Sequence, residues 1–191
     1  MLAPDHPRLL STIAGACAVG GGNIVDAQIY TTTDGMALDT ISLSREFERD
    51  DDETRRAGRI AEGIEKALSG QVRLPEIVAK RAAPKSRLKA FAIEPEVLIN
   101  NQWSNRYTVI EVSGLDRPGL LYELTATLSK LSLNIASAHV ATFGERAVDV
   151  FYVTDLLGAQ IVSATRQAAI KRALIHLLAP AHEPAKARAA G

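Results

Sequence analysis

The sequence contains one unit twice, and this internal repeat restricts the possible folds more than any single motif does. A shift of 111 residues places Asp5 on Asp116 and Asn23 on Asn134, and after a predicted hairpin loop a shift of 110 places Asp39 on Asp149. A small difference in length is tolerated in such a loop. The other identical pairs are Pro7 and Pro118, Leu9 and Leu120, Leu10 and Leu121, Ile24 and Ile135, Ala27 and Ala138, Thr31 and Thr142, and Ala37 and Ala147. We therefore predict two units of one fold.

The second copy predicts the order strand, helix, strand, strand, helix. Alternating β-branched residues indicate its strands, and apolar residues three and four positions apart indicate its helices. The predicted strands are 107–112, 135–142 and 147–154, and the predicted helices are 116–134 and 163–178. Asp116 is expected to cap the first of these helices. With both helices on one face of a mainly antiparallel sheet, the fold class is α+β, with two ferredoxin-like (βαββαβ) units.

The first copy predicts helices over 7–19 and 54–68 and strands over 24–32 and 37–44. Gly20–Gly22 indicate a helix stop, and the acidic run Asp50–Glu53 is typical of a helix N-terminus rather than of a metal site. Because the first helix begins so close to Met1, the N-terminal strand of this unit, which the fold places centrally, is expected to be largely missing. We infer from this gap that the chain is the C-terminal piece of a longer protein.

These patterns divide the chain into four segments. We predict a first domain over residues 1–80, a linker and edge strand over 81–95, a second domain over 96–179 and a disordered tail over 180–191. No fourth strand follows the last helix of the second copy. Glu96–Asn100 can fill the vacant sheet edge by pairing antiparallel with the strand at 107–112.

The composition excludes several classes of partner and site. The 22 Lys+Arg balance the 22 Asp+Glu, which argues against a nucleic-acid or membrane partner. Aromatic side chains suited to stacking RNA bases are lacking too, because the neighbours Phe151 and Tyr152 point to opposite faces of their strand. The single cysteine, Cys17, excludes an intramolecular disulfide, is expected to pack in the core, and favours a cytoplasmic location.

No catalytic motif is evident, so we assign neither catalytic residues nor metal ligands, and we expect no cofactor in this chain. The segment 115–121 has the strongest functional signal. It combines the unpaired amides of a helix N-terminus with Gly119, which has no Cβ to keep a ligand away. These residues are compatible with a carboxylate site and also with a plain strand-to-helix turn, and by themselves they leave both interpretations open.

The motif Asp116-Arg117-Pro118-Gly119-Leu120-Leu121, followed by Asn134-Ile135 and a glycine-containing hairpin, resembles the ACT domain, a small amino-acid-sensing module. Four further segments extend the likeness to the C-terminal tandem ACT region of the bifunctional uridylyltransferase/uridylyl-removing enzymes, which modify the PII nitrogen-signalling protein. These segments are 23–29, 37–40, 97–101 and 148–153.

The resemblance implies a regulatory region that senses glutamine and switches the enzyme allosterically between its two activities on PII. The catalytic domains, and the Mg²⁺ that one of them binds, would lie upstream, so no catalytic residue is carried over and enzyme activity is left open. Together with the loop, the resemblance gives a ligand site at Leu115, Asp116, Gly119, Leu120, Leu121, Asn134 and Ile135, with the side-chain oxygen of Asn134 accepting from the ligand's ammonium group.

The first copy has Arg8 in place of the loop glycine, so we expect no ligand there. An alternative is a free-standing ACT-repeat protein that binds a ligand or pairs subunits. A homo-oligomer formed through the ACT sheets is a further expectation.

Overall fold

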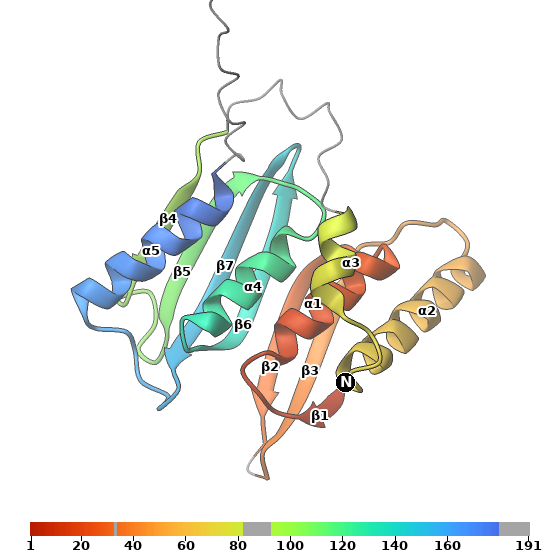
Figure 1. Cartoon of the computed structure of the whole chain (residues 1–191), viewed down its shortest axis with the longest axis horizontal. Helices are drawn as coiled ribbons and strands as arrows, with labels where there is room; N and C mark the ends of the chain where they lie inside the picture. Colours follow the sequence, from red (N-terminus) through yellow and green to blue (C-terminus); the bar gives the residue numbers. More distant parts are fainter. Residues whose placement is uncertain (33, 82–92, 180–191) are drawn as a thin grey trace, which may run out of the picture.

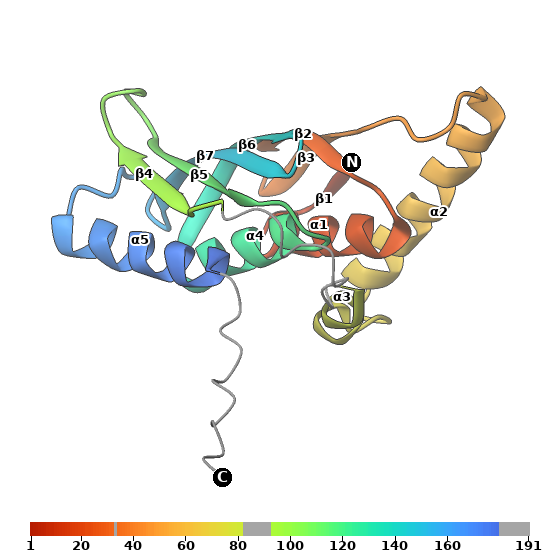
Figure 2. The ribbon, with the colours of Figure 1, turned by 90° about the horizontal axis from the view of Figure 1, so that it is seen from above.

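The computed structural model describes residues 1–32, 34–81 and 93–179, and it contains one antiparallel sheet of seven strands in the order β1-β3-β2-β6-β7-β5-β4 (Figure 1). Figure 2 shows the helices on one face of this sheet. The elements in chain order are β1 (Leu2–Pro4), α1 (Leu9–Gly20), β2 (Ile24–Thr31), β3 (Met36–Leu43), α2 (Asp50–Leu68), α3 (Leu74–Arg81), β4 (Glu96–Asn100), β5 (Thr108–Leu115), α4 (Leu120–Lys130), β6 (Leu133–Phe143), β7 (Arg146–Asp155) and α5 (Ala164–Leu178). The predicted α+β class with ferredoxin-like units is confirmed. The predicted tail and most of the predicted linker lie outside the described residues, and the domain boundaries stay a prediction.

The second unit has the predicted order of elements. The edge strand β4 pairs antiparallel with β5, with Val97 opposite Val112, and so occupies the place of the fourth strand. The apolar stripe of α4 packs onto the sheet, where Leu124 and Leu128 are fully buried with Phe151. The side chain of Ser163 caps α5 by accepting a hydrogen bond from the amide of Arg166 at 3.3 Å.

The first unit keeps only a three-residue version of its first strand. β1 pairs antiparallel with β3, with Leu2 opposite Leu38, as β5 pairs with β7 in the second unit. A central strand was expected. β1 instead forms the sheet edge, because none of the described strands lies on its other side. The core of this unit combines Leu9, Ile13 and Ile60 of the helices with Ile24 of β2 and Ala37 of β3.

The two units share one sheet because β2 pairs antiparallel with β6. Ala27 lies opposite Ala138, which is its own counterpart in the repeat. The register shifts also fall at equivalent places, between Ile24 and Asp26 in β2 and between Ile135 and Ser137 in β6. The pairing thus relates the two units by a pseudo-two-fold axis through Ala27 and Ala138.

The helices α1 and α4 meet across this axis on the covered face of the sheet (Figure 2). A Cβ built on Gly15 of α1 would lie 2.8 Å from Cδ2 of Tyr122, so glycine permits their close approach. The hydroxyl of Ser129 in α4 also donates a hydrogen bond to the carbonyl of Pro7. The units are therefore in contact through helices as well as through strands.

Several helix boundaries differ from the sequence prediction. α4 ends at Lys130 rather than at Asn134, because Ser132 takes a left-handed backbone (φ 58°) and Asn134 already belongs to β6. α2 begins at Asp50, so the acidic run forms its first turn, and Glu53 accepts hydrogen bonds from the amides of Glu46 and Phe47. The glycine stop of α1 is confirmed, since Gly21 has φ 77°.

The short helix α3 was not predicted. It packs against α1 and buries Leu74 and Val78. None of the described helices is long and apolar enough to cross a membrane.

Candidate ligand pockets between the repeat units

A pocket of about 390 Å³ lies where the loop before α4 faces the end of α1. We call it the Gly119 pocket. Its first-unit wall consists of Ala14, Ala18 and residues 21–24, and its second-unit wall consists of residues 116–122. Strands β6 and β7 contribute Val140, Thr142, Ala147 and Asp149. Both repeat units are therefore needed to form it.

The loop ends in an uncapped helix N-terminus. Gly119 is the N-cap residue of α4, has φ 84°, and makes no side-chain cap hydrogen bond. The amide of Leu120 donates to the carbonyl of Arg117 at 3.0 Å. The next amides in the first turn of a helix have no intrahelical acceptor and carry the positive end of the helix dipole. These amides belong to Leu121 and Tyr122, which both line the pocket. An anion in the pocket can accept hydrogen bonds from them.

The structure corrects the capping role expected of Asp116 and places Gly119 beside α3. Asp116 does not cap α4, because Gly119 is the N-cap residue and no side chain makes a cap hydrogen bond. The amide of Asp116 instead donates to the carbonyl of Glu145 at 2.8 Å, and its carboxylate accepts from Thr142 Oγ1 at 3.4 Å. A Cβ on Gly119 would lie 2.7 Å from Cγ1 of Val78, so the glycine accommodates α3 and the left-handed backbone, and its predicted role beside a ligand stays a prediction. Sequence reasoning missed this contact because α3 itself was not predicted.

Arg117 lines the pocket, but its guanidinium group is engaged elsewhere. It forms an ion pair with Glu123 and donates to the carbonyl of Leu177 at 3.3 Å. The loop is thereby attached to α5. The positive potential available to a ligand comes mainly from the helix N-terminus.

Asp149 is a pocket residue that sequence reasoning missed. It is 2% exposed, and its Oδ1 has no hydrogen-bond partner among the described residues. Burial, and then the nearby charge of Asp116, raise the pKa of Asp149 to about 7. The repeat could have pointed to Asp149, because Asp39 and Asp149 are identical residues at equivalent positions of the two copies.

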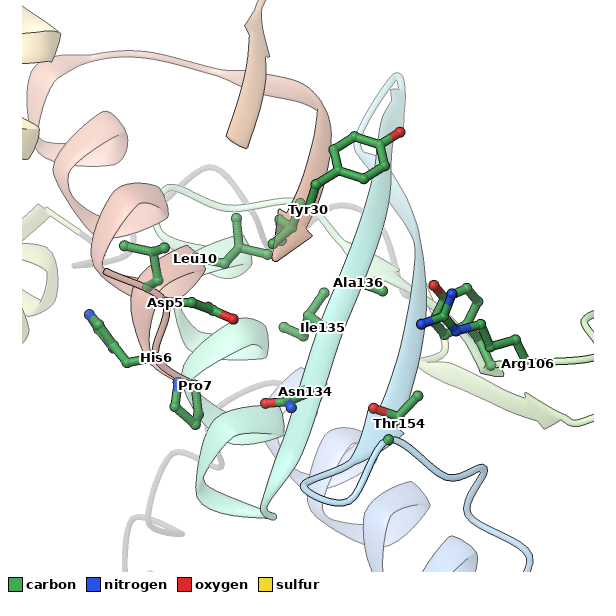
Figure 3. Close-up of a pocket in the computed structure, with 14 residues that line it drawn as sticks. Asp5, His6, Pro7, Leu10, Tyr30, Arg106, Asn134, Ile135, Ala136 and Thr154 are labelled. Atoms are coloured by element: carbon green, nitrogen blue, oxygen red, sulfur yellow. The ribbon is translucent and has the colours of Figure 1, made fainter. Parts of the chain in front are cut away.

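A second pocket, of about 320 Å³, lies on the other side of the pseudo-two-fold axis. We call it the Asn134 pocket. It is formed by the first unit's loop, including Asp5, His6 and Pro7, and by Asn134 and Ile135 of β6, which face this loop in Figure 3. Each pocket therefore combines the loop of one unit with the strand start of the other.

This arrangement separates the predicted site residues. Asp116, Gly119, Leu120 and Leu121 line the Gly119 pocket, Asn134 and Ile135 line the Asn134 pocket, and Leu115 lines neither. Their repeat counterparts Asn23 and Ile24 complete the Gly119 pocket instead. The reason is the antiparallel pairing of β2 with β6, which brings each loop to the opposite unit. Asn134 and Gly119 therefore line different pockets, and the ligand contacts predicted for them stay predictions.

Metal binding has no structural support within the described ranges, because no group of three or more His, Cys, Asp or Glu side chains there could hold an ion. Cys17 is buried, as predicted, and burial raises the pKa of its thiol to about 11. A thiol that stays protonated is a poor nucleophile.

Comparisons with known proteins agree with the motifs. Residues 108–171 match the ACT domain family. The chain is similar to proteins named "Bifunctional uridylyltransferase/uridylyl-removing enzyme" from Nitrobacter hamburgensis (73% identity), Rhodopseudomonas palustris (75%) and Bradyrhizobium sp. strain ORS 278 (74%). Each match covers 94% of this chain but only 19% or 20% of the relative, so the chain spans about a fifth of their length. The resemblance found in the sequence is confirmed: the chain contains an ACT domain and is closely similar, over nearly all of its length, to one segment of the bifunctional uridylyltransferase/uridylyl-removing enzymes.

Proposed function

We propose that this chain is the amino-acid-sensing regulatory region of a protein-PII uridylyltransferase/uridylyl-removing enzyme, with glutamine as its ligand. The observation that carries the proposal is the Gly119 pocket, in which the uncapped N-terminus of α4 meets the end of α1 from the other repeat unit. Its volume of about 390 Å³ is within the range of small-molecule sites, roughly 300–1,000 Å³. The uridylyltransferase part of the proposal is supported by the name of the relatives that are 73–75% identical to this chain.

The geometry supports a ligand with a carboxylate group. Backbone amides at a helix N-terminus form charge-assisted hydrogen bonds with anions in a place that the helix dipole also favours. The residues in this role are Leu121 and Tyr122, whose amides lie in the first turn of α4, because the amide of Leu120 already donates to the carbonyl of Arg117. The ligand's α-carboxylate would be held here.

Regulation follows from the position of the pocket. A ligand that touches α1 and the α4 loop at once stabilises the arrangement of the two units in which both walls are in place. It can shift a conformational equilibrium only by its difference in affinity between two states. In the full-length enzyme, acting on PII in the cytoplasm, such a shift would reach the catalytic domains, which would also contain the Mg²⁺ sites.

Replacing Ala18 by Leu tests this site. Ala18 lies in α1 on the pocket wall, and leucine is a good helix former that would occupy ligand space. We expect glutamine affinity to fall by about tenfold or more, equivalent to ~1.4 kcal/mol, in a calorimetric titration.

Ala61→Leu is the matched control, because Ala61 is an exposed residue of α2 that lines neither pocket. It should bind glutamine as the parent chain does. Equal affinity in Ala18→Leu and the parent would exclude the Gly119 pocket. A parent chain that binds no glutamine would contradict the sensing proposal itself.

A second candidate function is the pairing of subunits through the sheet. The face of the sheet that the helices leave uncovered favours it, because apolar side chains are exposed there. Opposite the helices, this face exposes Tyr30 (59%), Leu38 (50%) and Leu98 (39%). Sedimentation of the parent and of Leu38→Glu tests pairing. A concentration-dependent dimer that the variant abolishes would support it, and a monomer at all concentrations would exclude it.

A further inference from the structure

Asp149 is a buried carboxylate placed in the wall of a ligand pocket. Its residue exposure is 2%, it lines the Gly119 pocket, and its Oδ1 accepts no hydrogen bond from the part of the chain that the structure describes. Burying an ionised carboxylate without a partner is costly, and such groups are normally paired or hydrogen-bonded. A cationic ligand group would supply the missing partner.

Among the described residues that line the pocket, no basic side chain is left without a partner. Of its lining residues, Arg117 alone is basic, and it is paired with Glu123 and bonded to the carbonyl of Leu177. The first-unit wall, formed by Ala14, Ala18 and residues 21–24, is uncharged. The pocket therefore has acidic groups beside β7 and positive potential at the start of α4. This polarity fits a zwitterion.

We propose that Asp149 binds the ammonium group of an amino-acid ligand whose carboxylate is held by the N-terminus of α4. The inference rests on the proposed function and assigns a residue to it. Asn134, the acceptor expected from the sequence, lines the other pocket, and Asp116 already accepts a hydrogen bond from Thr142. Of these two acidic pocket residues, Asp149 has the fully buried oxygen without a partner among the described residues.

The repeat supplies an internal comparison. Asp39, the counterpart of Asp149, is equally buried at 2% exposure, and both of its carboxylate oxygens lack partners among the described residues. Asp39 lines neither pocket. Both residues are buried beside the loop aspartate of their own unit, but of the two only Asp149 lines the Gly119 pocket.

Ligand binding at Asp149 must be linked to a proton. The pKa of Asp149 is raised to about 7 by burial and by Asp116, so near neutral pH part of the protein holds this group protonated. The remaining ionisable lining residues are Arg117 and Tyr122, and the strand neighbours of Asp149, Val112 and Val140, are uncharged. An ammonium group binds the ionised form, so binding at lower pH releases the proton. Affinity should fall as pH decreases below 7, by up to about tenfold per pH unit.

Calorimetric titration of the whole chain tests the assignment with two probes, glutamine and its analogue without the ammonium group, glutaramic acid. The variants are Asp149→Asn and the matched control Asp39→Asn. We expect the parent and Asp39→Asn to prefer glutamine by about tenfold or more. Asp149→Asn should bind the two probes with similar affinity and should lose the dependence on pH.

The outcomes separate the two proposals. If the parent binds glutamine and Asp149→Asn keeps both its affinity and its preference, the role of Asp149 is wrong while the sensing function stands. If neither the parent nor Asp39→Asn binds glutamine, both proposals fail.

A measurement on the parent alone covers the case of a variant that does not fold. At pH 6, titrations in two buffers of different ionisation enthalpy should report release of most of one proton per glutamine bound. Release of no proton would overturn the inference.

Discussion

At the scale of single residues, Asp39 and Asp149 occupy equivalent positions of the repeat and have a similar chemical environment in both units. Each is a buried aspartate on the covered side of the third strand of its unit, and each has the loop aspartate of its own unit nearby. Burial and Asp5 raise the pKa of Asp39 to about 6, although the Met1 ammonium group opposes this, and burial and Asp116 raise that of Asp149 to about 7. The same polar arrangement therefore occurs twice, once beside the Gly119 pocket.

These shifts predict how stability depends on pH. An aspartate in an unfolded chain has a pKa of about 3.9. Between about pH 4 and pH 7 the folded state therefore binds more protons than the unfolded state, and the free energy of unfolding contributed by these groups falls as pH rises. Their stabilising contribution is complete below pH 4 and lost above pH 7.

Asp149→Asn should remove most of this dependence. Asparagine stays neutral. We therefore expect the free energy of unfolding of the variant, relative to that of the parent, to increase by on the order of 2 kcal/mol from pH 5 to pH 8. Urea unfolding at the two pH values measures the difference, and Asp39→Asn should show a smaller change in the same direction. Identical pH profiles for all three proteins would mean that neither carboxyl group titrates as described.

At the scale of elements, Arg56 attaches α2 to the end of α1. Its guanidinium group is nearly buried and donates to the carbonyls of Gly21 at 2.9 Å and Ser44 at 3.0 Å. It also forms an ion pair with Glu53 at 3.1 Å. Because Gly21 lines the Gly119 pocket, this arginine holds part of the pocket wall in place.

Arg56→Ala should destabilise the chain by about 2–4 kcal/mol, because two carbonyls lose a charged donor in partly buried hydrogen bonds and Glu53 loses a partner. The matched control is Arg55→Ala, whose side chain is 75% exposed and whose partner Asp52 is 3.8 Å away. Exposed pairs of this kind contribute about 0–1 kcal/mol. Thermal and urea unfolding of both variants check the difference, and similar losses for both would contradict the role of Arg56.

At the scale of the whole molecule, pairing of β2 with β6 turns two small units into one sheet and creates both pockets. Ala27 and Ala138 face each other on the pseudo-two-fold axis and are 0% and 1% exposed. A single continuous sheet holds the loop of each unit against the strand start of the other unit. Among the described elements, β2 and β6 also make the most extensive contact between the two units.

Enlarging the side chain at the axis should weaken this contact. We expect Ala138→Leu to destabilise the chain by about 1–3 kcal/mol through overpacking, and to reduce ligand affinity because both pocket walls shift. Ala141→Leu, in the same strand but partly exposed, should change stability by roughly 0.5 kcal/mol or less. Urea unfolding and calorimetry measure the two effects. Unchanged stability in Ala138→Leu would show that the axis is loosely packed.

The sequence by itself determined the features that depend on local pattern. The spacing of apolar residues was sufficient to predict the helices α4 and α5. The glycines after α1 predicted where this helix ends, and the short connection after Glu96–Asn100 predicted that β4 pairs with β5. The repeat established that the two units share a fold. Each of these properties involves residues close together in the chain, or a direct comparison of one copy with the other.

Only the tertiary structure decided which groups meet in a site. The loop at Gly119 faces Asn23 rather than Asn134, α3 places Val78 against Gly119, and Asp149 is left buried with an unpaired oxygen. The first of these contacts follows from the pairing of β2 with β6, whose partners Ala27 and Ala138 are 111 residues apart. Such a pairing depends on the summed packing of two complete units, and no periodicity within either unit encodes it.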